Sequence, residues 1–132
     1  MNILFFITPK DKTSFVYSSF SLRQVLEKMD ICGYTSIPVI NEAGKYLFTI
    51  TEGDILRFIK KTNNLSLKNS EKINILNIEI KKEVKSIKIY SNIEDLIDLA
   101  LSQNFVPIVD DNDTFIGIIT RKSILSYFAK KI

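Results

Sequence analysis

The chain has 132 residues, enough for one compact domain or for two small halves that share a core. Hydrophobic residues make up 45% of it, which is typical of a globular protein and excludes a disordered one. The net charge of +3 is modest, and we expect no nucleic-acid partner, because proteins that bind nucleic acids usually carry a basic stripe or cluster.

The chain contains one cysteine, Cys32, and no histidine. An intrachain disulfide is therefore impossible, which favours a reducing, cytoplasmic location. The same composition excludes the common zinc sites and the nucleophilic triads that depend on histidine, so no metal site is expected. Residues 1–7 are apolar but have no basic segment before them, and they are too few for a signal sequence or a membrane span. We expect them to form a short helix or an interface segment, with no membrane partner.

In the first half, residues 13–17 are β-branched or aromatic and predict a short strand. Ser21 is a good helix N-cap with Gln24 at the capping-box position, and Gly33 is a typical helix end. The apolar run 37–40 predicts a strand that is buried on both faces. A polar turn at residues 41–45 and a strand at 46–51 complete a hairpin.

A second helix is predicted to begin near Asp54 and to end at Lys60 and Lys61, which suit the negative pole of the helix dipole. The polar residues 62–72 predict a linker between the halves. The same series then returns: an apolar segment at 73–80, a strand at 84–90, a helix capped by Asn92, strands at 106–109 and 115–120, and a helix at 123–131. Each half therefore reads as strand, helix, strand, strand, helix.

Two prolines and two threonines mark the repeat. Pro38 and Pro107 each stand inside a buried strand, and each is followed 13 residues later by a threonine, Thr51 and Thr120. The offset between the copies is 69 residues, the difference between 107 and 38, and it also relates Ile55 to Ile124. A repeated unit of this size indicates two copies of one fold.

This pattern resembles the cystathionine-β-synthase (CBS) domain: a helix, a segment x-x-h-P-V-h-N/D, a hairpin, and h-h-T-x-x-D-h-L, where h is apolar. Two such domains form a CBS pair, or Bateman module, and the resemblance covers nearly the whole chain. The segments 11–12, 33–39 and 120–122 are similar to those of stand-alone CBS-pair proteins of Gram-positive bacteria, some of which bind cyclic di-AMP.

The resemblance implies an α+β or α/β fold of tandem CBS domains, each β-α-β-β-α, that pack with pseudo-two-fold symmetry. Residues 1–61 would be CBS domain 1 with its N-terminal lead-in, residues 62–72 the linker, and residues 73–132 CBS domain 2.

Two helix starts are the strongest candidates for binding chemistry. A helix that begins beside Thr51 and Asp54 offers free backbone N–H groups to a phosphate, and the carboxylate can accept hydrogen bonds from a ribose diol. The alternative is that Thr51 and Asp54 only cap the helix. In the second half Ser123 replaces the aspartate of the family motif, while Arg121 and Lys122 add positive charge that suits phosphate. The alternative there is a solvated helix start.

The resemblance also implies two clefts, each of which combines the entry strand and the x-x-h-P segment of one copy with the T-x-x-D segment of the other. The residues predicted for cleft A, the more basic one and the one suited to a phosphate-rich ligand, are Lys12, Ser14, Val16, Thr35, Ser36, Thr120, Arg121 and Ser123. The residues predicted for cleft B, which suits adenosine or AMP, are Lys85, Ile87, Asn104, Phe105, Thr51 and Asp54. Ordinary packing or solvent exposure is the alternative for several of them, and Phe105 in particular is expected to pack.

The sequence lacks a P-loop, a GxGxxG segment and a nucleophile–base set, so we expect no enzyme and no required cofactor. The expected function is a non-catalytic regulatory module that binds an adenine nucleotide, AMP, ATP or cyclic di-AMP, and signals to an effector protein that the sequence does not identify. The family also suggests a homodimer, with apolar surfaces at residues 3–7, Phe58, Ile59, Tyr127 and Phe128. The alternative is a structural or protein-interaction module whose ligand sites are degenerate and unoccupied.

Overall fold

The computed structural model describes residues 1–132, and the contacts among them divide the chain into two compact units. Unit 1 contains residues 1–13, 44–46 and 84–132, and unit 2 contains residues 14–43 and 47–83. The first 13 residues thus pack with the second half of the chain, although they precede the first half in sequence. The domain boundaries predicted from the repeat follow the sequence copies, whereas the units follow the packing.

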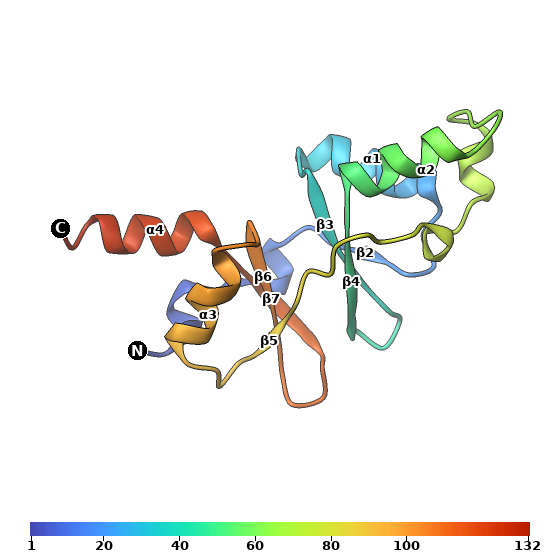
Figure 1. Cartoon of the computed structure of the whole chain (residues 1–132). Coiled ribbons are helices and arrows are strands. Elements are labelled where there is room, and N and C mark those ends of the chain that lie inside the picture. Colours follow the sequence, from blue (N-terminus) through green and yellow to red (C-terminus); the bar gives the residue numbers. More distant parts are fainter. The chain divides into compact units, whose positions relative to one another are not determined.

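Unit 2 carries the first copy of the repeat. Its sheet has the strand order β2-β3-β4, and β2 runs parallel to β3 with Val16 beside Val39. A parallel pair requires a crossover connection, which α1 supplies. The elements, whose helices and strands are labelled in Figure 1, are β2 (Val16–Tyr17), α1 (Leu22–Cys32), β3 (Ser36–Ile40), β4 (Tyr46–Thr51), α2 (Glu52–Lys61) and the 3-10 helices η3 (Asn69–Lys72) and η4 (Ile75–Asn77).

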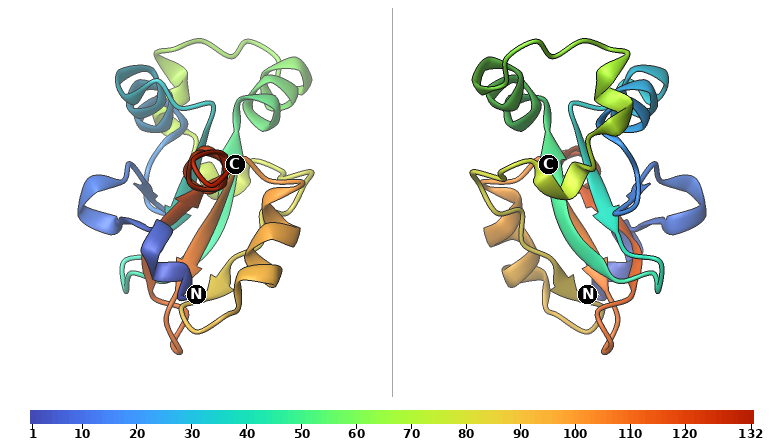
Figure 2. Two further views of the ribbon diagram at one scale, coloured as in Figure 1. Left: turned by 90° about the vertical axis from the view of Figure 1, so that its left-hand side faces the viewer. Right: turned by 90° about the vertical axis from the view of Figure 1, so that its right-hand side faces the viewer.

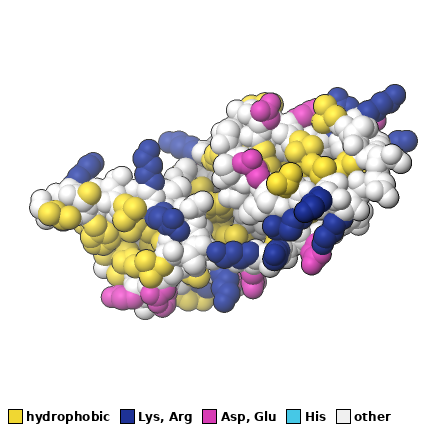
Figure 3. Space-filling model, turned by 45° about the horizontal axis from the view of Figure 1, so that its top comes forward, with side chains coloured by type: hydrophobic (Ala, Val, Ile, Leu, Met, Phe, Trp, Pro, Cys, Tyr) yellow, Lys and Arg dark blue, Asp and Glu magenta, His cyan; other side chains and the backbone are white.

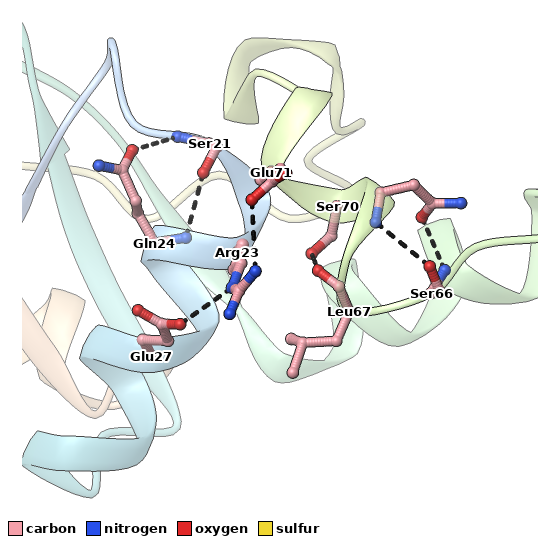
Figure 4. A network of polar contacts seen from close by, with 9 residues as sticks. Ser21, Arg23, Gln24, Glu27, Ser66, Leu67, Ser70 and Glu71 are labelled. Carbon is pink, nitrogen blue, oxygen red and sulfur yellow. Dashed lines mark hydrogen bonds and ion pairs between the residues drawn. The ribbon is translucent and has the colours of Figure 1, made fainter.

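The start of α1 confirms the predicted capping box (Figure 4). The backbone N–H of Gln24 donates to Oγ of Ser21 at 3.2 Å, and the N–H of Ser21 donates to Oε1 of Gln24 at 2.8 Å. Arg23 pairs with Glu27 on α1 and with Glu71 on η3, so the polar segment after α2 is attached to α1. These ion pairs are exposed and contribute little energy, whereas the N–H of Leu22 donates to the carbonyl of Ile73 and attaches the chain after η3 to the start of α1.

The core of unit 2 lies between its sheet and its two helices. It is formed by apolar residues that the 3.6-residue and two-residue periods direct to one side: Val16, Leu22, Val25, Met29, Ile37, Val39, Ile50, Ile55, Ile75 and Ile78. Residues 37–40 of β3 are all buried, which confirms the prediction of a strand covered on both faces.

Unit 1 carries the second copy and the N-terminus. Its sheet has the order β1-β7-β6-β5, with β5 parallel to β6 and the other pairs antiparallel. The elements are η1 (Ile3–Phe6), β1 (Thr8–Pro9), η2 (Lys10–Lys12), β5 (Ile87–Lys88), α3 (Ile93–Ala100), β6 (Phe105–Val109), β7 (Phe115–Thr120) and α4 (Arg121–Ala129). Figure 2 shows these elements from two sides.

The N-terminal segment forms the predicted short helix, η1, and it belongs to the core of unit 1. Ile3 is fully buried and Phe6 is 6% exposed, in one cluster with α3, β6 and β7. Phe6 also makes an edge-to-face contact with Tyr127 of α4. Residues 44–46 join the same unit, because Tyr46 donates its N–H to Asp113 and Phe115 donates to Gly44.

Gly117 permits the pairing of β1 with β7. A Cβ at this position would lie 2.3 Å from the carbonyl oxygen of Thr8, and the φ of Gly117 is 156°. Since no real Cβ approaches an oxygen so closely, only glycine lets the N-terminal strand reach the sheet.

The structure corrects three element bounds. The last helix begins at Arg121 and not at Ser123, because Thr120 is its N-cap. The two entry strands are shorter than predicted, at residues 16–17 and 87–88. No helix of the structure combines the length and the apolar character that spanning a membrane requires.

Candidate functional site

The carboxylate of Asp54, at the start of α2, accepts three hydrogen bonds. The hydroxyl oxygen of Thr51 accepts the N–H of Asp54 at 3.1 Å, and Oδ2 of Asp54 accepts the N–H of Thr51 at 3.0 Å. Oδ1 accepts from Nη2 of Arg57 at 2.5 Å and from the N–H of Lys81 at 3.3 Å. The capping interpretation of Thr51 and Asp54 is therefore correct for this structure, and three of the roughly four acceptor positions of the carboxylate are in use.

Asp54 is only 2% exposed, and a buried carboxylate requires a cation and hydrogen bonds. Arg57 supplies the cation from the next turn of α2. Sequence reasoning did not single out Arg57, although an acid and an arginine three residues apart on a helix are a known pairing signal.

The start of α4 is capped in the same way in unit 1. Oγ1 of Thr120 accepts the N–H of Ser123 at 3.1 Å, and the Ser123 hydroxyl donates to the carbonyl of Thr120 at 2.8 Å. Nε of Arg121 donates to the carbonyl of Ala100 at 2.7 Å, at the end of α3, where carbonyl groups lack helical partners. The hydroxyl of Ser123 and one N–H of Arg121 are thus already used inside the unit.

An equivalent backbone bond ties each helix start to the segment before the buried strand of its own copy. Glu52 donates its N–H to the carbonyl of Thr35 at 2.9 Å, and Arg121 donates to the carbonyl of Asn104 at 2.8 Å. Phe105 also lies opposite Thr120 in the β6–β7 ladder. Each unit therefore brings together the two motifs of one copy, while the grouping of motifs from different copies in clefts A and B stays a prediction.

The other residues predicted for clefts A and B differ in how far their side chains are exposed to solvent. Val16 is fully buried and Phe105 is 9% exposed, so their side chains pack against the interior of their units and a ligand could meet chiefly their backbone. Ser14, Ser36 and Ile87 are half-buried. The exposed residues are Lys12, Thr35, Lys85 and Asn104.

Gln103 is a buried residue that sequence reasoning missed. Its Nε2 donates to the carbonyl of Lys85 at 3.0 Å and to that of Phe105 at 3.2 Å, and its Oε1 accepts the N–H of Lys85 at 2.8 Å. It therefore clamps the segment before β5 to the start of β6. The one available signal was a polar residue two positions before an apolar strand.

Unit 2 contains two cavities. One of about 390 Å³ lies between α1 and α2 and is lined by Leu26, Met29, Asp30, Gly33, Tyr34, Glu52, Ile55, Leu56 and Ile59. The other, of about 380 Å³, lies beside α2 and is lined by Asp54, Arg57, Phe58, Lys61, Thr62, Asn77, Glu79 and Lys81. The structure gathers no group of three acidic or cysteine side chains that could hold a metal ion.

The turn between β6 and β7 carries the clearest electrostatic effects. Oδ1 of Asp110 accepts the N–H groups of Thr114 and Asn112, which lowers the pKa of Asp110. Lys88 donates to the Asp113 carboxylate, and this hydrogen bond raises the pKa of Lys88. Both effects stabilise the turn and lie outside the predicted site.

The fold defines the class of protein: a tandem repeat of one β-α-β-β-α unit, with a threonine-capped helix start in each copy. The profile of the CBS domain matches residues 9–61 and 77–130, and the chain belongs to the CBS domain family as a pair of such domains.

The chain is similar to one curated protein and to several solved structures. An uncharacterized protein of Methanocaldococcus jannaschii is 27% identical over 115 residues, which cover 82% of this chain and 41% of that protein. The chain thus spans about two fifths of the length of that curated relative. The structure of CbpB of Listeria monocytogenes in complex with c-di-AMP has a TM-score of 0.82 and 24% identity, over 95% of this chain and 92% of that chain. The structure of CBSX2 in complex with AMP has a TM-score of 0.76 and 19% identity, over 98% of this chain and 97% of that chain.

Proposed function

We propose that this CBS pair is a non-catalytic regulatory module that binds an adenine nucleotide and signals to a partner protein. The observation that carries the proposal is the pair of equivalent helix starts at Thr51 and Thr120. In each helix, the first backbone N–H donates a hydrogen bond to a carbonyl of the segment before the buried strand, and the third donates to the hydroxyl of the capping threonine. The second backbone N–H, that of Gly53 in α2 and of Lys122 in α4, has no acceptor within its own helix. Such an N–H at the positive end of a helix suits an anionic ligand.

The starts of α2 and α4 carry opposite charges, so each favours a different kind of ligand. Arg121 and Lys122 provide two cations at the start of α4, while Glu52 and Asp54 provide two acids at the start of α2. A phosphate-rich ligand such as cyclic di-AMP or ATP is therefore assigned to the group named cleft A. A ribose at Asp54 would take the one open acceptor position or displace the N–H of Lys81, so occupation of cleft B is the weaker expectation.

Two relatives of known structure support the ligand class, since one holds c-di-AMP and the other AMP on the same fold. A ligand can act as a signal only if it binds two conformations with different affinity. The identity of the effector protein does not follow from these contacts.

The substitution Arg121→Ala tests whether a phosphate-bearing ligand binds in cleft A. It removes a charge-assisted contact to phosphate and should make the binding free energy of such a ligand less favourable by about 1.5–3 kcal/mol. Calorimetry with cyclic di-AMP, ATP and AMP measures the loss, and mass spectrometry of the ligand that copurifies with the protein identifies the physiological one. Asp54→Ala should weaken only the binding of a ribose in cleft B, and the variant is compared after its folding is checked, because it also leaves Arg57 without its ion-pair partner. Unchanged affinity in both variants would show that the clefts are misassigned.

A structural or protein-interaction module with empty sites is the second candidate. Two observations favour it: Ser123 replaces the family's aspartate, and Asp54 is already bonded by three donors. Thermal shift with AMP, ATP, cyclic di-AMP and S-adenosylmethionine separates the two, because a bound ligand stabilises the folded state. The absence of any shift at millimolar ligand would support the structural module.

We also propose that the chain forms a homodimer through the cavity between α1 and α2. Ile31, Leu56 and Ile59 are 84%, 67% and 42% exposed on these helices, and Asp30 and Glu52 add acids to the lining. The helix α4 exposes Leu125 and Phe128 and contains Arg121 and Lys122 but no acid. The exposed apolar side chains of α4 make this helix of a second copy a suitable occupant.

A further inference from the structure

The second cavity of unit 2 is separate from the two helix-start groups except for Asp54, and no binding role follows for it from the proposed function. It lies between α2 and residues 77–81, which run past that helix. An ion pair of Lys61 and Glu79 at 3.8 Å and the bond from the Lys81 N–H to Asp54 hold the two segments together. In Figure 3 several lysine and arginine side chains gather on the visible face of the part that carries α1 and α2.

The cations of this cavity exceed the acids that can neutralise them. Asp54 is buried and paired with Arg57, while Lys61 and Glu79 are 71% and 83% exposed, so their pair is weak. The ammonium group of Lys81 lies in no ion pair. An anion that enters the cavity can therefore pair with the ammonium group of Lys81, which has no acidic partner. It can also pair with Lys61, because the exposed ion pair between Lys61 and Glu79 is weak.

Arg57 is held in place before any ligand arrives. Its Nη2 donates to the buried Oδ1 of Asp54, and its guanidinium lies beside Gly53, where an added Cβ would be 3.4 Å from Nη1. Only one of the five guanidinium N–H groups is used by this bond, and four remain for a ligand. Because the guanidinium group of Arg57 is already held in one orientation, this side chain loses little conformational entropy when a ligand binds.

The uncharged lining residues suit an aromatic group. Phe58 is half-buried and lines the cavity, as do the Asn77 amide and the Thr62 hydroxyl. The volume of about 380 Å³ falls in the range of small-molecule sites. We propose that this cavity binds a small phosphate monoester with an aromatic ring, the phosphate on Arg57 and Lys81 and the ring against Phe58.

Phenyl phosphate is the probe, because it carries the phosphate and the aromatic ring without ribose or adenine, and the Arg121→Ala variant separates its binding in this cavity from phosphate binding at the start of α4. Nuclear magnetic resonance titration of the full chain should show saturable shifts at Phe58, Thr62 and Lys81. Lys81→Gln should weaken binding about fivefold, the effect expected for the loss of one solvent-exposed ion pair. Lys60→Gln is the matched control, since Lys60 is an exposed lysine of α2 outside the lining, and it should leave the affinity unchanged.

Further arms of the same titration separate this proposal from the proposed function. Arg121→Ala should leave phenyl phosphate binding intact, because Arg121 belongs to unit 1. Phenol alone should bind more weakly than phenyl phosphate, since it lacks the anion. Linear shifts that never saturate, or equal losses in Lys81→Gln and Lys60→Gln, would overturn the cavity assignment whatever the outcome with adenine nucleotides.

Discussion

The bond between Arg57 and Asp54 illustrates how single side chains stabilise unit 2. Arg57 is 41% exposed and its partner 2%, so the arginine neutralises a charge that water does not reach. Arg57→Ala should lower the free energy of unfolding by about 1–3 kcal/mol, less than for a fully buried pair because solvent screens the arginine. Urea denaturation measures the loss. The double variant Arg57→Ala with Asp54→Asn should recover part of it, and no recovery would contradict a role in charge compensation.

Gly117 is the residue on which the attachment of the N-terminus depends. Gly117→Ala places a Cβ against the carbonyl of Thr8 and should destabilise the protein by about 1–3 kcal/mol, the usual range for overpacking. Thermal unfolding measures it. Gly53→Ala is the control, because a Cβ at Gly53 meets only side-chain atoms at 3.4 Å or more and an alanine favours helix. Equal losses in both variants would argue against the close approach of β1 and β7.

Among the elements, the β6–β7 turn responds to pH. The pKa of Asp110 is lowered in the folded state by the N–H groups of Thr114 and Asn112, so this carboxylate stabilises the fold above its ordinary pKa of 3.8. The contribution is lost as the pH falls through the folded pKa. A carboxyl titration by nuclear magnetic resonance should place the midpoint of Asp110 below 3.8. A midpoint at or above that value would mean that the turn does not hold these bonds in solution.

At the scale of the whole molecule, the proposed homodimer can be tested at the cavity between α1 and α2. Leu56→Glu replaces an exposed apolar side chain of the lining by a charge that an apolar contact would remove from water, and it should convert a dimer to a monomer. Light scattering after gel filtration measures the mass. Leu67→Glu is the control, as Leu67 is 58% exposed but lies outside this lining. A wild-type protein that is monomeric at all concentrations would refute the dimer.

The sequence alone determined the repeat and the order of elements, because both depend on short-range signals. The capping box of Ser21 and Gln24, the left-handed Gly33 and the buried run 37–40 act within a few residues, and each occurs as predicted. The equal offset of Pro38/Pro107 and Thr51/Thr120 revealed two copies of one unit, and the resemblance of the segments around them pointed to the CBS family, which the match at residues 9–61 and 77–130 confirms.

Only the tertiary structure decided which segments lie together. Residues 1–13 pack with the second half because Gly117 lets β1 reach β7, a contact that no local pattern announces. Likewise Lys81, 27 residues beyond Asp54, donates to that carboxylate, and Ala100 receives the Nε of Arg121. In both candidate ligand sites, some of the hydrogen-bonding groups are therefore already used by other residues of the chain. Side-chain pairings across long loops depend on the packed geometry, which the spacing of residues along the sequence does not specify.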